Sequence, residues 1–195
     1  MPSRRVVAVL VASAALMALA GCTSGAPDPD DTPAVTAPQA DISGEWVVTR
    51  TVTASNDAGN PARAVGATSV RYVLVERDDC DEALCEGTVS SGETLEGREE
   101  TALAQTDGGF DYAFVGSLDC MNVATGGVLV VDGFDYEQSA TLTASSTDGT
   151  TADALTGTIV YTDAVTEKAL AAGCTRDPLA VEITYSVAAT RTPAS

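Results

Sequence analysis

The chain has 195 residues and carries 28 acidic residues against 10 basic ones, which gives a formal net charge of −18, and it contains no histidine. So negative a chain argues against binding to nucleic acid or to anionic lipid headgroups, because both are polyanions. The lack of histidine excludes Ser-His-Asp and Cys-His catalytic arrangements, as well as any histidine-bound metal.

The first 21 residues have the three parts of a secretion signal, in the required order. Arg4 and Arg5 make a short basic start, an apolar stretch covers residues 6–20, and small residues follow at its end. The apolar stretch is shorter than the roughly 20 residues that cross a bilayer as a helix. We therefore expect residues 1–21 to be a cleaved signal peptide.

The stretch ends in Leu19-Ala20-Gly21-Cys22, which resembles the lipobox of bacterial lipoproteins. The resemblance implies that the Cys22 sulfur is joined to diacylglycerol and that cleavage makes Cys22 the mature N-terminus. It also implies a place on the extracytoplasmic face of the cell membrane, held by acyl chains. The Ala- and Thr-rich chain is also similar to small secreted lipoproteins of high-GC Gram-positive bacteria. An ordinary secretion signal in which Cys22 is incidental is the alternative.

A segment rich in proline and aspartate follows the lipobox. Pro27, Pro29, Pro33 and Pro38 interrupt any regular pattern between residues 22 and 40. Proline-rich chain extends by about 3.1 Å per residue. We expect residues 22–40 to be a disordered spacer, and residues 41–195 to form one β-rich extracytoplasmic domain.

Short segments with apolar residues at every second position fill most of that domain. In residues 181–187, Val181, Ile183, Tyr185 and Val187 share one face and polar residues share the other. A stripe at Val70, Tyr72 and Leu74 predicts another strand. The expected strands cover residues 44–53, 70–74, 86–90, 99–105, 110–114, 136–144, 155–161 and 181–187.

About eight antiparallel strands predict an all-β domain, an up-and-down barrel with a β-sandwich as the alternative. One short helix is expected before Cys174. Asp163 would be its N-cap, residues 164–172 its body and Gly173 its C-cap.

Cysteine numbers fit an oxidising compartment. With Cys22 assigned to lipid, four cysteines remain, an even number that predicts two disulfides. Three pairings are open, and we favour Cys80 with Cys85 and Cys120 with Cys174. The four lack the paired short spacings of zinc sites, so we expect no metal here.

The first expected strand opens with Gly44-Glu45-Trp46, which resembles the Gly-x-Trp signature of lipocalin and calycin barrels. The resemblance implies an eight-stranded barrel whose closed end is plugged by Trp46, with a late arginine packed on that ring. Arg191 is the candidate for this role. Residues expected inside the barrel are Trp46, Val48, Tyr72, Phe110, Tyr112, Tyr161 and Tyr185. The interior could be a ligand cavity or a packed core.

Acidic residues are the remaining source of chemistry. Those around Cys80 could suggest calcium, and paired carboxylates or Lys168 could suggest catalysis. Acids in loops rich in glycine and serine are better explained as solvated turns, so we expect no metal, no cofactor and no enzyme activity. The sequence favours a non-catalytic binding module of the cell envelope, with a small apolar ligand or an envelope protein as partner. The alternative is a structural or interaction component with a solid core.

Overall fold

The computed structural model describes residues 40–192, apart from residues 78–85, 95, 97, 107 and 108. Cys22, the spacer and the Cys80–Cys85 loop of the sequence analysis lie outside the described residues. Among the residues that are described, no helix is long and apolar enough to span a membrane.

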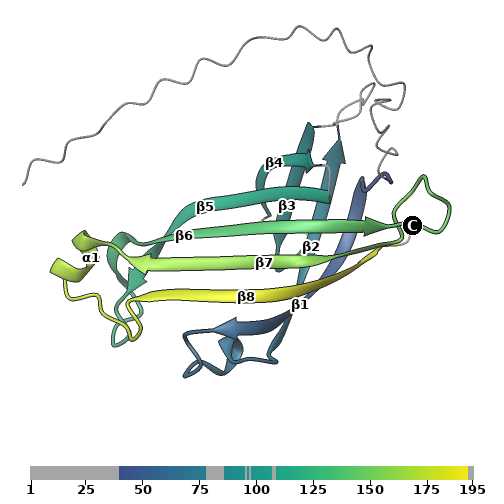
Figure 1. Ribbon diagram of the computed structural model, residues 1–195. Helices are drawn as coiled ribbons and strands as arrows, with labels where there is room; N and C mark the ends of the chain where they lie inside the picture. The colour runs from purple at the N-terminus through teal and green to yellow at the C-terminus, as the bar shows by residue number, and fades with distance from the viewer. Residues whose placement is uncertain (1–39, 78–85, 95, 97, 107–108, 193–195) are drawn as a thin grey trace, which may run out of the picture. The chain divides into compact units, whose positions relative to one another are not determined.

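Eight antiparallel strands form a closed barrel in which each strand pairs with its neighbour in the chain and β1 pairs with β8 (Figure 1). The expected up-and-down barrel is therefore confirmed. The strands are β1 (Gly44–Ser55), β2 (Thr68–Arg77), β3 (Glu86–Gly92), β4 (Glu99–Thr106), β5 (Gly109–Met121), β6 (Val128–Ser145), β7 (Ala154–Val165) and β8 (Ala180–Arg191). A 3-10 turn, η1 (Pro61–Arg63), lies between β1 and β2.

The period-two pattern of the sequence accounts for the core. Val181, Ile183 and Val187 of β8 are buried, and the residues between them are more exposed. Phe110, Tyr112 and Phe114 of β5 and Leu155 and Ile159 of β7 also point inward. Burial of these apolar side chains provides the main stabilising free energy of the barrel.

In strand β2, the prediction that Val70, Tyr72 and Leu74 form the inward-facing stripe is wrong. The buried residues are Val73 and Val75. Val73 pairs with the buried Trp46, whereas Tyr72 pairs with Val47 on the other face. Directly opposed residues in an antiparallel pair share a face, and a shift of one residue moves a whole stripe to the other face. Tyr72 is therefore on the outer face of the barrel.

One end of the barrel is closed by Trp46. Its ring is fully buried, and its indole N–H donates to the Ile42 carbonyl at 2.8 Å. The Arg191 guanidinium lies over the ring, 4.8 Å from the centroid, and donates to the carbonyls of Asp41, Ser43 and Ala152. The contact between Arg191 and Trp46 that the Gly-x-Trp resemblance implies is thus present.

Gly44 is required at this end. Its φ is +117°, and an added Cβ would lie 2.9 Å from Arg191 Nη1. A side chain here would be strained by the backbone conformation and would also push the guanidinium from its place.

The short helix α1 (Glu167–Ala171) begins later than expected. Thr166 is its N-cap and accepts from the Ala169 N–H at 3.3 Å. Asp163, the expected N-cap, instead lies within β7 and pairs with Val181 of β8. The strand continues to Val165 because its pairing with both neighbours continues, so the capping role passes to the first residue beyond the strand.

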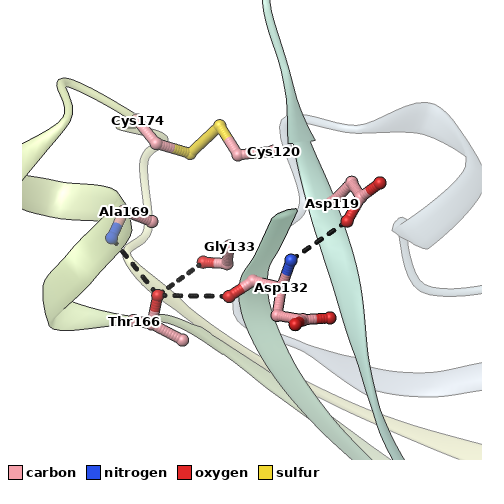
Figure 2. Close-up of a disulfide and its surroundings, with 7 residues drawn as sticks. All are labelled: Asp119, Cys120, Asp132, Gly133, Thr166, Ala169 and Cys174. Carbon is pink, nitrogen blue, oxygen red and sulfur yellow. Dashed lines mark hydrogen bonds between the residues drawn. A yellow bond between two sulfur atoms is a disulfide. The ribbon is translucent and has the colours of Figure 1, made fainter. Parts of the chain in front are cut away.

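The disulfide between Cys120 and Cys174 joins the end of β5 to the segment after α1 (Figure 2). Its Cα atoms are 6.3 Å apart. The Thr166 hydroxyl also reaches the Gly133 carbonyl of β6 at 3.3 Å. Together these contacts hold α1 against the β5–β6 hairpin, and the favoured pairing of Cys120 with Cys174 is confirmed.

Candidate functional site

A pocket of about 450 Å³ lies in the barrel interior, where β2, β3 and β4 face β5, β6 and β7. We call it the barrel pocket. It opens to solvent past the exposed residues Glu93, Glu99 and Leu118. Its lining consists of Arg71, Ser91, Gly92, Glu93, Glu99, Phe114, Leu118, Tyr136, Gln138 and Tyr161.

Two tyrosines make an aromatic wall of the pocket. The rings of Tyr136 and Tyr161 are stacked, with centroids 6.2 Å apart and an interplanar angle of 21°. Gly116 leaves room for this wall, because an added Cβ would lie 2.9 Å from the Tyr136 ring. Stacked rings offer a flat apolar surface that suits a flat ligand.

The pairing between β4 and β5 is short beside the pocket, and a side chain of β6 reaches across to β4 there. Backbone pairing of these strands covers only Leu103–Thr106 and Gly109–Tyr112. Farther along, the Tyr136 hydroxyl crosses to Glu99 at 2.7 Å. Burial, together with this carboxylate, raises the pKa of Tyr136 to about 12. Tyr136 therefore keeps its proton at neutral pH and can donate it in this hydrogen bond.

Below the pocket lies Arg50, a buried arginine on the inward face of β1. Its side chain is 6 % exposed. The guanidinium donates to Gln138 Oε1 at 3.0 Å and twice to Ser69 Oγ at 3.3 Å, and it lies 4.9 Å from the Tyr185 ring centroid. Burial first, and then the nearby Arg71 charge, lower the pKa of Arg50.

Arg50 has no carboxylate within ion-pair distance among the described residues. Arg71, which lines the pocket, is paired with the exposed Glu93 at 2.9 Å. A buried charge is normally paired, because desolvating it costs free energy that neutral partners only partly offset. Arg50 is therefore a buried guanidinium whose hydrogen-bond partners in the described residues are all neutral.

Tyr112 is a second buried polar residue whose charge interacts with that of Arg50. Tyr112 is 6 % exposed. The ring packs edge-on against Phe114, with centroids 5.6 Å apart. Burial raises the pKa of Tyr112 to about 12, although the Arg50 charge acts in the opposite direction.

The raised pKa of Tyr112 predicts that the barrel loses stability in alkali. An unfolded tyrosine ionises near pH 10, so the higher folded pKa gives stability that is complete below pH 10 and is lost as the pH rises towards 12. The shift corresponds to about 2 to 3 kcal/mol. We expect Tyr112→Phe to move the alkaline unfolding midpoint, followed by circular dichroism, to higher pH. Tyr72→Phe is the matched control on the outer face, and an equal shift in the control would contradict this role of Tyr112.

The tryptophan and the tyrosines expected inside the barrel lie in four different places. Trp46 and Tyr112 belong to the packed core. Tyr161 lines the pocket, Tyr185 lies under it beside Arg50, and Tyr72 is outside.

Arg50, Arg71, Tyr136 and Gln138 were not among the residues predicted from the sequence. The signal for Arg50 was available, because it continues the inward alternation of Trp46, Val48 and Val52. A charged residue in an apolar stripe marks either a paired ion or a binding group.

No family model, curated protein or solved structure matches the chain. Within the described part of the chain, no three residues of the types histidine, cysteine, aspartate and glutamate gather into a group that could hold a metal ion. Asp78, Asp79, Asp81 and Glu82, which were weighed as calcium ligands, lie outside the described residues.

Proposed function

We propose that this chain is a non-catalytic binding module, anchored by lipid to the extracytoplasmic face of the cell membrane, that holds a small ligand in the barrel pocket. The observation that carries the ligand part is the pocket of about 450 Å³ beneath an aromatic wall. Small-molecule sites in proteins commonly have volumes of about 300 to 1,000 Å³.

Retention of a ligand is the direct test of the binding module. The full chain is isolated from the membranes of its own host and examined by native mass spectrometry. We expect an added small-molecule mass that disappears when the protein is unfolded. A bare protein mass in every preparation would contradict the proposed function.

The anchor rests on the sequence Leu19-Ala20-Gly21-Cys22 after an apolar leader. We expect Cys22→Ala to release the folded barrel into the medium, because a diacylglycerol on this sulfur would supply two acyl chains and two such chains give stable attachment. Fractionation followed by non-reducing electrophoresis measures both release and the Cys120–Cys174 disulfide. Ser24→Ala is the matched control and should stay with the membrane. Retention or unfolding of the Cys22→Ala protein would count against the anchor.

A second candidate is an interaction component of an envelope complex. The observation that favours it is the apolar surface of the β5–β6 hairpin, where Val123 is 99 % exposed and Val131 is 59 % exposed. Exposed apolar patches often mark protein contacts. This candidate predicts a bare mass for the isolated chain, together with a complex in the membrane that Val131→Asp disrupts.

A further inference from the structure

The buried charge of Arg50 suggests which ligands the barrel pocket accepts. A guanidinium has five N–H donors. The hydrogen bonds of Arg50 to the described residues use three of them, and all three acceptor contacts are with the neutral oxygens of Ser69 and Gln138. Two donors, one on each terminal nitrogen, remain for another acceptor.

We propose that the barrel pocket binds a small organic monocarboxylate and that Arg50 recognises its negative charge. This inference rests on the proposed ligand-binding function. The planar fork of a guanidinium matches the two oxygens of a carboxylate, and a charged pair of this kind is stronger than a pair of neutral groups.

Gln138 connects Arg50 to the pocket. Its side chain lines the pocket, and its Oε1 atom accepts from Arg50 Nη1 at 3.0 Å. The amide oxygen thus occupies a place that a carboxylate oxygen would take. Rotation of this one side chain brings the guanidinium into contact with a ligand, while the backbone of β6 stays paired with β5 and β7.

The other charged groups of the pocket favour a single negative charge on the ligand. Arg71 is matched by Glu93, and Glu99 accepts from the Tyr136 hydroxyl. The carboxylates of Glu93 and Glu99 belong to exposed residues at the pocket opening, whereas Arg50 is buried below the pocket. Beside the pocket, Arg50 is therefore the guanidinium without a carboxylate partner in the described residues, and its single charge matches a ligand with one anionic group.

The wall of the pocket indicates the rest of the ligand. The stacked rings of Tyr136 and Tyr161, with Phe114 nearby in the lining, offer a flat apolar surface. The net charge of −18 repels anions at long range. Affinity for a carboxylate would therefore have to come from the local pairing with Arg50, and we infer an aromatic or similarly flat body attached to the acid group.

The test compares 1-naphthylacetate with its neutral analogue 1-naphthylacetamide, each titrated calorimetrically into the full chain. We expect one-to-one binding, with the acid bound at least about tenfold more tightly than the amide, as a charge-assisted pair provides. Equal affinity of the two compounds would overturn the carboxylate inference and leave the binding module intact. Failure of both to bind would count against the binding module itself.

Two variants assign the charge recognition to Arg50. Arg50→Gln should reduce the affinity for the acid to that for the amide and leave the amide unchanged. The variant should fold with an equal or higher melting temperature, since it removes a buried charge that has no carboxylate partner. Gln138→Glu should give Arg50 an internal carboxylate and likewise abolish the preference for the acid.

Lys168→Gln is the matched control, because it removes one positive charge from an exposed position on α1. It should bind both compounds as the unchanged chain does. If Arg50→Gln and Gln138→Glu retain the preference for the acid, or if Lys168→Gln loses it as well, Arg50 is not the recognising group.

Discussion

Replacing Asp163 with alanine is expected to lower the free energy of unfolding by about 3 kcal/mol, because it removes a buried carboxylate that pairs with two partly buried arginines. The Asp163 side chain is 1 % exposed and forms ion pairs with Arg176 and, at 3.7 Å, with Arg63. It also accepts from the Tyr161 hydroxyl at 2.8 Å. These contacts join β7 to η1 and to the segment before β8.

Urea unfolding at neutral pH measures this loss. Asp135→Ala, at an exposed position on β6, is the matched control and should change stability by less than about 0.5 kcal/mol. Adding Arg176→Ala to Asp163→Ala should cost less than the sum of the two single changes, since both remove one interaction. Strictly additive losses would show that the pair acts only as two separate packing groups.

The second large effect is expected at the closed end of the barrel. Arg191→Ala removes three hydrogen bonds from a guanidinium to backbone carbonyls, and also the contact with the face of Trp46. Hydrogen bonds from charged groups contribute about 1.5 to 3 kcal/mol each when buried. Arg191 is only partly buried, so we expect a total loss of about 3 kcal/mol.

For a domain of this size the loss corresponds to a decrease of about 10 °C in melting temperature. Arg71→Ala is the matched control, because its pair with the exposed Glu93 should contribute less than about 1 kcal/mol. A melting temperature for Arg191→Ala within about 2 °C of the unchanged chain would contradict the role of Arg191 in closing the barrel.

The barrel could be predicted from the sequence because its strands alternate strongly. In β8, polar residues separate Val181, Ile183, Tyr185 and Val187, so only one face can be buried. The contact between Arg191 and Trp46 could be predicted too, but only through the resemblance to a known signature. Alternation alone left barrel and sandwich equally open, and only the pairing of β1 with β8 distinguishes them.

The errors have local physical causes. In β2 both faces carry apolar residues, Tyr72 and Leu74 on one and Val73 and Val75 on the other, so the pattern does not fix the register. Asp163 has the side chain of a helix cap, but continued strand pairing and two arginines from distant segments place it in the sheet. Contacts between residues so far apart in the chain leave no local pattern to detect.

The candidate site was harder to predict than the fold. Apolar alternation selects the core, whereas the pocket is lined by residues that depart from it, such as Arg71 and Gln138. Of the residues at the candidate site, Arg50 could have been selected from the sequence, because it occupies an inward position of β1 between Val48 and Val52. An inward charge without a local partner gives no information about which distant groups surround it.

Binding of an organic acid in the barrel pocket is proposed to depend on Arg50. The most direct measurement follows the side-chain Nε–Hε resonance of Arg50 by nuclear magnetic resonance while 1-naphthylacetate is added to the full chain. We predict a saturable shift of this resonance, together with shifts of the Gln138 side-chain amide. Shifts confined to the exposed β5–β6 hairpin around Val123, with Arg50 and Gln138 unchanged, would contradict the claim.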